Sequence, residues 1–548
     1  MNSFKPMLLT SLKSYDRAQF AKDVTAGIIV AIIALPLSIA LALASGVGPE
    51  AGIFTAIVAG FVISALGGSC VQIAGPTAAF ATIVAGIVAR DGLEGLMTAT
   101  ILAGVFLIIM GFCHFGSLIK FIPYTITTGF TSGIAVTIVI GQLKDFCGIT
   151  YPDGVKPIET MEKLKAFAEN FSTISPDALI VGGVSLAILI VSPLIFKKIP
   201  GSLIAVIAGI LMVQFLPLHV STIGNLYTIS NALPTLHLPV FDMKLIQSAI
   251  PNAFTIAVLA AIESLLSCVV ADGMINSKHR SDTELIAQGA GNIASALFGG
   301  IPATGAIART AANIKNGGRT PVAGMVHSIT LVIVLVVLMP FAGMIPMPTI
   351  AAILFLVAYN MCQWRTFVHL VRTAPKSDII VLFTTFVLTV VFDLVVAIEI
   401  GMVLACLLFI KRMSEETHAD SWVYVDDDSP AVDEHLQKLP LEIRVYEITG
   451  PLFFGAADAI EHIVVKDFTK CLVLRMRSVP TIDSTAMNAL QNLTKLCESK
   501  GITLVFSHVN EQPMKMMKKS GFVELVGEEN FCANISDALN HAEALISR

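Results

Sequence analysis

The sequence predicts a polytopic α-helical membrane protein that carries a small α/β domain at its C-terminal end. Of the 548 residues, 55% are hydrophobic and only 14% are charged, and the mean hydropathy is +0.79. A soluble protein of this size has roughly 25% charged residues. Apolar runs fill residues 24–411, and an acidic segment followed by alternating strand and helix patterns occupies the rest. The chain lacks a basic patch with interleaved aromatic residues, so nucleic acid is not an expected partner.

Four parts follow from this division. We expect an N-terminal cytoplasmic segment (1–22), a transmembrane domain (23–411), an acidic linker (412–440) and a cytoplasmic α/β domain (441–548). The first part contains basic residues but no apolar core with a cleavage site, so no cleaved signal is expected. The nine cysteines form no C-x-x-C pair, which predicts neither a disulfide framework nor a zinc site.

The transmembrane domain contains about fourteen segments that could cross a bilayer. A spanning helix needs about 17–25 predominantly apolar residues, and several segments here are short or interrupted by glycine and proline. The predicted spans are residues 24–44, 51–67, 74–89, 94–115, 122–141, 177–195, 201–216, 249–271, 284–298, 304–315, 321–341, 346–360, 377–393 and 396–410.

Basic residues give the orientation of these spans. With the N-terminus inside, most of them fall in predicted cytoplasmic loops, as the positive-inside rule expects. The inside set is Lys197, Lys198, Lys278, Arg280, Lys315, Arg319, Arg365, Arg372, Lys376, Lys411 and Arg412. The outside set is mainly Lys156, Lys163 and Lys165. We therefore place both termini in the cytoplasm and the chain in the inner (plasma) membrane.

A weak internal repeat is visible. Pro36 and Glu263 are separated by 227 positions, as are Thr77 and Thr304. Two halves of seven spans each would have opposite orientations. Inverted repeats of this kind meet at a midplane binding site built from discontinuous helices.

Two segments, VQIAGPTAAFA (71–81) and GGIPATGAIART (299–310), break the helical pattern. A helix that starts within the membrane has N–H groups without partners and a positive dipole end, which attracts an anion. We predict that the two starts face each other and form an anion site with hydroxyls from Thr77 and Thr304. Small neighbours would let the ligand approach the backbone: Ala78, Ala79, Ala303 and Gly305. The alternative is a pair of ordinary kinks at helix contacts.

Three polar residues extend this prediction. Arg309 lies about one turn into the second half-helix and would raise the positive potential beneath the anion, or else extend to the cytoplasmic side as a topology anchor. Glu263 could take up a proton, because burial disfavours its charged form, or bind sodium together with Ser267, one turn later. A structural ion pair between Glu263 and Arg309 is the alternative. Beyond a coupling proton or sodium ion, no cofactor is predicted.

The C-terminal part has the pattern of a small α/β domain. Strand-like runs cover residues 441–448, 471–476 and 502–506, and helix-like runs cover 455–464, 484–499, 511–519 and 535–546.

Four stretches resemble a known family. SDTELIAQGAGNIASALFGGIPATGAIARTAAN (281–313) and IAGPTAAFA (73–81) resemble the sulfate permease (SulP) family of anion transporters. GPLFFGAA (450–457) and SVPTIDSTAMNAL (478–490) are similar to the STAS domain of that family.

The resemblance implies fourteen helices in two inverted seven-helix repeats, divided into a core and a gate domain that move past each other like an elevator. It places the anion between the third and tenth spans and a coupling acid at Glu263. The anion site it implies is Gly75, Thr77, Ala78, Ala303, Thr304 and Gly305, with Arg309 beneath. It also implies a homodimer in the bilayer.

Two details refine what is implied. Many members have P-Q-x-x-A-Y-A in the first span, where this chain has Leu37 and Leu41 in place of the polar and aromatic residues. That form resembles the bacterial branch associated with C4-dicarboxylates.

Ser484 corresponds to a serine that is phosphorylated in related anti-sigma antagonists, although Asp483-Ser484-Thr485 is also typical of a helix N-cap.

The function predicted is therefore proton- or sodium-coupled symport of a small anion, regulated by the STAS domain and its cytoplasmic protein partner, and not enzymatic catalysis. The candidate cargoes are sulfate, bicarbonate, and C4-dicarboxylates such as succinate and fumarate. The rivals are a nucleobase permease of the same fold and a membrane-anchored STAS signalling protein that transports nothing.

Overall fold

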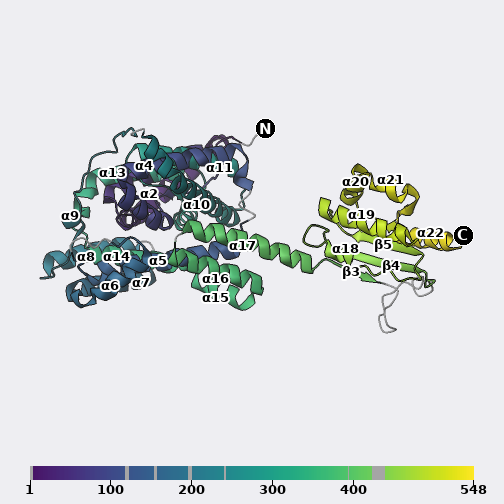
Figure 1. Ribbon diagram of the computed structural model, residues 1–548. Coiled ribbons are helices and arrows are strands. Elements are labelled where there is room, and N and C mark those ends of the chain that lie inside the picture. Colours follow the sequence, from purple (N-terminus) through teal and green to yellow (C-terminus); the bar gives the residue numbers. More distant parts are fainter. Residues whose placement is uncertain are drawn as a thin grey trace. The chain divides into compact units, whose positions relative to one another are not determined.

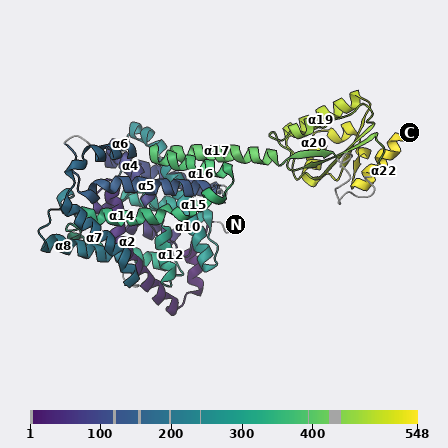
Figure 2. The same ribbon diagram turned by 90° about the horizontal axis from the view of Figure 1, so that it is seen from below.

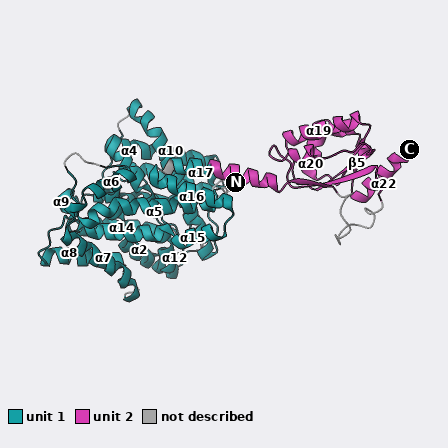
Figure 3. Cartoon of the chain, turned by 60° about the horizontal axis from the view of Figure 1, so that its bottom comes forward, with its two compact units in different colours: residues 1–402 teal, residues 403–548 magenta. Residues whose placement is uncertain are grey.

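The computed structural model describes residues 4–117, 122–152, 157–195, 200–239, 242–392, 394–421 and 439–547. The chain divides into two compact units, Met1–Met402 and Val403–Arg548, each of which is described by itself (Figure 3). Lys156, Lys197 and Lys198, used above for orientation, lie outside the described residues, as does the acidic stretch 422–438.

The first unit is built from long apolar helices. Among the described residues, eight helices are long and apolar enough to cross a membrane. Helices matching the predicted spans are α2 (Arg17–Ala44), α3 (Pro49–Leu66), α4 (Ala81–Phe112), α5 (Tyr124–Cys147), α7 (Pro176–Ile195), α8 (Gly201–Phe215), α10 (Met243–Ile275), α11 (Ser281–Leu297), α12 (Ile307–Lys315), α13 (Val322–Ala342), α14 (Met347–Cys362), α16 (Lys376–Val391) and α17 (Leu394–Glu415). Shorter helices are α1 (Met7–Ser11), α6 (Thr160–Glu169), α9 (Ile223–Leu226) and α15 (Trp364–Thr373).

Two predicted spans correspond to two helices that meet at a kink. The segments 74–89 and 94–115 join in α4, which is broken at Gly92, where φ is 70° and ψ is −169°. A residue with a side chain rarely adopts this conformation, so glycine allows the kink between the two helices of α4.

The helices of the first unit form two groups. In the first group α4 packs against α10 and α11, and α13 packs against α2 and α3. In the second group α5 packs against α14 and α16, and α7 packs against α8 and α14. Figure 1 shows the first group above the second. These groups correspond to the predicted core and gate.

The second unit is an α/β domain with a five-stranded sheet in the order β3-β4-β5-β6-β7. The strands are β3 (His418–Ser421), β4 (Ile443–Thr449), β5 (Cys471–Ser478), β6 (Thr503–Ser507) and β7 (Phe531–Cys532). The helices are α18 (Asp458–Glu461), α19 (Ser484–Ser499), α20 (Glu511–Lys519), α21 (Phe522–Val526) and α22 (Ile535–Ile546). The pairs from β4 to β7 are parallel, and β3 is antiparallel to β4. Buried apolar clusters cover both faces of the sheet, with α19 on one face and α22 on the other.

The sequence prediction for this unit differs from the structure at its beginning. Residues 412–421, expected within an acidic linker, contain the end of α17 and the edge strand β3. The sequence HADS of β3 is polar and its side chains alternate between half-buried and exposed, so no apolar pattern marks it as a strand. The predicted helix 455–464 is reduced to the single turn α18.

Candidate functional site

The two interrupted segments lie side by side within the first unit. Residues 74–75 form β1 and residues 304–305 form β2, and these short strands pair in antiparallel register, Ala74 with Gly305 and Gly75 with Thr304. The N–H of Ala306 extends the pairing by donating to the carbonyl of Ile73 at 2.9 Å. A 3-10 turn, η2 (Ala78–Phe80), follows β1 and leads into α4, and α12 follows β2. Two helix starts therefore emerge from one strand pair in opposite directions.

Glycine is required at both strands. A Cβ on Gly305 would overlap the side-chain amide of Gln72, which leaves no room for a larger residue. A Cβ on Gly75 would lie 2.6 Å from Nη1 of Arg309, and the φ of Gly75 is 154°. The small residues predicted from the sequence thus allow close approach of the strands to each other and to Arg309.

Arg309 lies in the first turn of α12 and is only 4% exposed. Its Nη2 donates to the carbonyl oxygen of Pro76, while its Nη1 has no hydrogen-bond partner among the described residues. The guanidinium is therefore enclosed beneath the turn between β1 and η2 and is not extended to the surface as a topology anchor. One N–H-bearing nitrogen remains able to donate to a ligand.

Glu263, on α10, contacts the first break directly. The hydroxyl of Thr77 donates to Oε2 of Glu263 at 2.9 Å. Glu263 and Arg309 interact electrostatically, but the salt bridges within 4.0 Å among described residues do not include this pair. The alternative of a direct structural ion pair is therefore not what the geometry shows.

Thr304 contacts the same helix from the second break. It is fully buried, and its hydroxyl donates to the carbonyl of Ala260 at 3.0 Å. The hydroxyl proton that was expected to bind the anion is thus directed at α10. In this arrangement Thr304 holds β2 in place.

Ser267 lies one turn after Glu263 on α10 but has a different contact. Its hydroxyl donates to Oγ1 of Thr310 at 3.4 Å, and that oxygen also accepts the N–H of Ile73 at 3.0 Å. Among the hydrogen bonds of the described residues, Ser267 and Glu263 are not joined. Ser267 therefore ties α10 to α12 and β1.

Buried polar residues that the sequence reasoning missed support the same segments. Asn292 of α11 makes two bonds to Ala303, accepting its N–H at 2.8 Å and donating to its carbonyl at 2.9 Å. Asn313 donates to the carbonyl of Val71 at 2.8 Å. Glu284, 1% exposed, accepts the N–H groups of Gly68 at 2.9 Å and Ser69 at 3.2 Å. In the run ELIAQGAGN (284–292), polar residues recur every four positions among apolar ones. This spacing could have indicated a buried polar face that supports the breaks.

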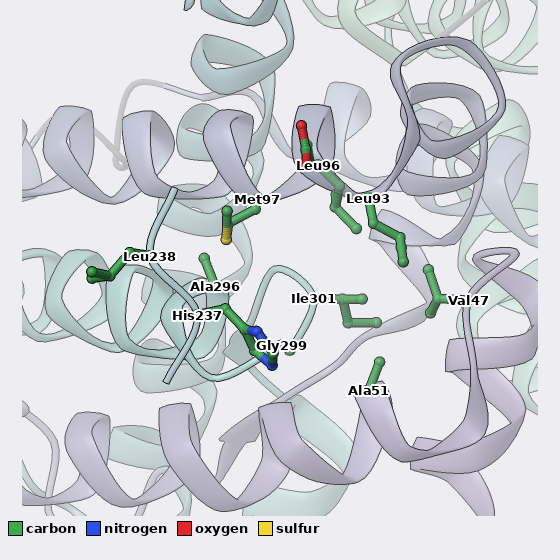
Figure 4. Close-up of a pocket in the computed structure, with 12 residues that line it drawn as sticks. Val47, Ala51, Leu93, Leu96, Met97, His237, Leu238, Ala296, Gly299 and Ile301 are labelled. Atoms are coloured by element: carbon green, nitrogen blue, oxygen red, sulfur yellow. The ribbon is translucent and has the colours of Figure 1, made fainter. Parts of the chain in front are cut away.

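A cavity of about 320 Å³ lies next to the second break (Figure 4). Gly299 and Ile301 form one side of it, and Leu93 and Met97 of α4 line it as well. His237 lies beside Gly299, and its N–H donates to the carbonyl of Leu297 at 2.7 Å. The cavity borders the residues that precede Ala303 and does not include the predicted anion-binding residues.

Comparison with known proteins gives the family of the chain and of its C-terminal domain. Residues 20–385 match the sulfate permease family, and residues 438–538 match the STAS domain. The chain belongs to the sulfate permease family. This confirms the resemblance inferred from residues 73–81 and 281–313.

Two relatives cover nearly the whole of this family member. The protein YvdB of Bacillus subtilis (strain 168), whose name assigns it provisionally to sulfate transport, is 38% identical over 95% of this chain and 97% of its own length. The bicarbonate transporter BicA of Picosynechococcus sp. (strain ATCC 27264 / PCC 7002 / PR-6) is 32% identical over 95% of this chain and 94% of its own. Both are named as transporters, in agreement with the prediction of a multi-pass membrane transporter and not an enzyme.

Solved structures show the same fold. The structure of SLC26A9 has a TM-score of 0.87 at 19% identity and covers 98% of this chain and 92% of its own. The transmembrane domain of a cyanobacterial BicA has a TM-score of 0.62 at 28% identity and covers 72% of this chain and 98% of its own. The predicted fold class, a helical permease domain followed by a STAS domain, is therefore confirmed.

In the STAS domain of this permease, Ser484 is the exposed first residue of α19. The residue before it, Asp483, caps the helix: Oδ1 accepts the N–H of Ala486 and Oδ2 accepts the N–H of Phe454, both at 2.9 Å. The capping role thus belongs to Asp483, and the hydroxyl of Ser484 stands free of it at a helix N-terminus, where added negative charge is favoured.

Two of the three cysteines of the STAS domain, Cys471 and Cys497, are buried. Burial raises the pKa of the Cys471 thiol to about 12 and that of Cys497 to about 11. These thiols stay protonated at neutral pH and are part of the apolar clusters on the two faces of the sheet.

Proposed function

We propose that this chain is a secondary active transporter that carries a small anion together with a proton or a sodium ion. The observation that carries the proposal is the pairing of β1 with β2, which joins two helix starts and encloses Arg309 beside them. Two positive dipole ends and a guanidinium with one uncommitted nitrogen form an environment that favours a negative solute.

The anion site in this proposal comprises Gly75, Thr77, Ala78, Ala303, Gly305 and Arg309, with Thr304 positioning β2. N–H groups of the first turn of α12 have no intrahelical partners and are available to an anion. These small residues let the backbone of β1 and β2 lie close to Arg309 and Gln72, because a Cβ on Gly75 or Gly305 would overlap those side chains.

Coupling is assigned to Glu263. Its carboxylate accepts the Thr77 hydroxyl and lies close enough to Arg309 for an electrostatic interaction. While Glu263 is charged, it repels a nearby anion and accepts the hydroxyl proton of Thr77, which is then not donated to the anion. Binding of a proton or a sodium ion neutralises the carboxylate. Cation binding therefore strengthens anion binding, and linkage makes the effect reciprocal. Ser267 would join a sodium site only after its hydroxyl left Thr310.

Movement in this proposal is a displacement of the α2–α4 and α10–α13 group against the α5, α7, α8, α14 and α16 group. The division of the first unit into these two packed groups supports it. We further propose that the chain forms a homodimer in the inner membrane with both termini in the cytoplasm, and that the STAS domain regulates transport through Ser484 and a cytoplasmic partner.

The cargo is proposed to be sulfate, bicarbonate, or a C4-dicarboxylate such as succinate or fumarate. The names of YvdB and BicA favour the first two. Leu37 and Leu41 in α2 favour a substrate with a carbon backbone, because they replace a polar and an aromatic wall with apolar surface.

Uptake into liposomes by the purified full chain tests this function. The panel is sulfate, bicarbonate, succinate, fumarate and uracil at two pH values, with and without a sodium gradient. We expect one class of anion to accumulate above its equilibrium level only when a cation gradient is present. Uptake of none of them would contradict anion transport and favour a signalling protein, and uptake of uracil instead would favour a nucleobase permease.

A further inference from the structure

The short helix α15, between α14 and α16, has a basic edge and an apolar face. It contains ten residues, and successive residues turn by about 100° around the helix. Its basic edge is formed by Arg365, His369 and Arg372, and its apolar arc by Trp364, Phe367, Val368, Leu370 and Val371. No residue of the helix is fully buried, which sets it apart from the spans on either side.

Half of the apolar arc packs against the protein. The ring of Phe367 lies 5.6 Å from that of Phe383 and 5.5 Å from that of Phe386, both on α16. Figures 1 and 2 both show α15 beside α16. At the preceding end, the hydroxyl of Ser132 on α5 donates to the carbonyl of Cys362 at 2.7 Å. The orientation of α15 is therefore set by α5 and α16.

The other half of the arc is exposed next to the arginines. Trp364 is 46% exposed and Val368 is 36% exposed, although both are apolar. The Trp364 indole donates to the hydroxyl of Tyr359, itself 59% exposed, at 3.2 Å. An exposed Trp and Tyr joined at the edge of an apolar surface are typical of a membrane interface.

The arginines of this edge form no ion pair with the acidic residues that the structure describes. Arg365 and Arg372 are exposed, and neither takes part in a salt bridge within 4.0 Å among the described residues. The guanidinium of Arg365 lies 5.6 Å from the centre of the Trp364 ring. Lys376, the exposed first residue of α16, adds a further positive charge nearby in the chain.

We propose that α15 is an interfacial helix that binds the headgroup of an acidic phospholipid through Arg365 and Arg372, while Trp364 and Val368 enter the boundary between headgroups and acyl chains. Positive charge beside an apolar strip matches a negative headgroup above hydrocarbon, and each Arg near an anionic surface contributes about 1 kcal/mol. Because α15 is held by α5 and α16, the bound lipid attaches that group of helices to one leaflet.

Native mass spectrometry of the full chain in detergent tests this proposal by titration with phosphatidylglycerol or phosphatidylcholine. The variant Arg365→Gln/Arg372→Gln should bind phosphatidylglycerol more weakly by about fivefold for each arginine, which is 1 kcal/mol converted to affinity. Binding of phosphatidylcholine should not change. Trp364→Ala should weaken binding of both lipids, because it removes apolar contact and not charge.

The matched control removes two exposed charges elsewhere, Arg90→Gln/Lys165→Gln, whose side chains are 64% and 77% exposed. All variants should elute as the parent protein does, since the changed residues are exposed. The proposal is overturned if the α15 variant keeps its preference for phosphatidylglycerol or if the control loses as much. It is also overturned if excess glycerol phosphate displaces the lipid fully while Trp364→Ala has no effect, because α15 would then be a site for soluble anions.

Discussion

The hydroxyl of Thr77 donates to Oε2 of Glu263 at 2.9 Å, so the first helix break contacts the carboxylate of α10 directly. The second break contacts the same helix three residues earlier, where Thr304 donates to the carbonyl of Ala260 at 3.0 Å. Both breaks are therefore attached to less than one turn of α10. A change in the charge of Glu263 acts on the first break through one hydrogen bond, and the second break is joined to the same turn of α10 through Ala260. This arrangement is the physical basis of coupling in the proposed mechanism.

Glu263→Gln should separate anion binding from coupling. The amide keeps an oxygen that accepts the Thr77 hydroxyl but carries no charge to be neutralised by a cation. We expect exchange of labelled anion across the membrane to persist, while accumulation driven by a pH or sodium gradient falls to the equilibrium level. Parallel exchange and gradient-driven uptake assays in liposomes measure the two properties.

The control for this change is Glu169→Gln, since the side chain of Glu169 is 63% exposed on α6. It should leave both assays unchanged. If the Glu263 variant still accumulates anion against its gradient, Glu263 is not the coupling residue.

Thr304→Val should weaken anion binding because β2 is no longer held against α10. The Thr304 hydroxyl itself is not expected to contact the anion. The variant removes the hydrogen bond to Ala260, and a bond of this kind contributes about 0.5–1.5 kcal/mol. Anion affinity should fall roughly two- to tenfold, as measured by tryptophan fluorescence or calorimetry. Thr304→Ser, which keeps the hydroxyl, should restore most of it. Equal weakening by both variants would show that the methyl group, not the hydrogen bond, holds β2.

Gly75→Ala should abolish transport by displacing Arg309. The added Cβ would lie 2.6 Å from Nη1 of Arg309, the nitrogen that has no partner among the described residues. The guanidinium and the β1–β2 pair cannot both keep their positions. Gly86→Ala in α4 is the matched control, because nothing lies within 4 Å of its added Cβ. Normal uptake by the Gly75 variant would show that Arg309 has free space beside it.

Much of the site could be predicted because it depends on local chemistry that repeats along the chain. Glycine and proline beside a threonine at two positions 227 residues apart predicted both helix breaks and their pairing. In the STAS domain, α19, α20 and α22 begin and end at the predicted residues, since each has a capping or acidic residue before a periodic apolar run.

Features that depend on tertiary contacts could not be predicted. Whether the Thr304 hydroxyl faces a ligand or the carbonyl of Ala260 depends on where α10 packs, which no local pattern specifies. The same holds for Ser267, which contacts Thr310 and not Glu263. The helix α15 was missed because a search for apolar spans passes over a ten-residue helix that is apolar on one side only.

Asp483→Ala should loosen the start of α19 in the STAS domain, whereas Ser484→Ala should not. Asp483 satisfies two backbone N–H groups, those of Ala486 and Phe454, and loss of a capping side chain costs about 1 kcal/mol. Hydrogen exchange of the full chain, followed by mass spectrometry, should therefore become faster by about fivefold in the peptides that contain these two residues. The Ser484→Ala variant should exchange as the parent does, because the exposed hydroxyl makes no capping bond. Faster exchange in both variants would mean that the two residues share the cap, and Ser484 would then be unsuited to a regulatory role independent of the fold.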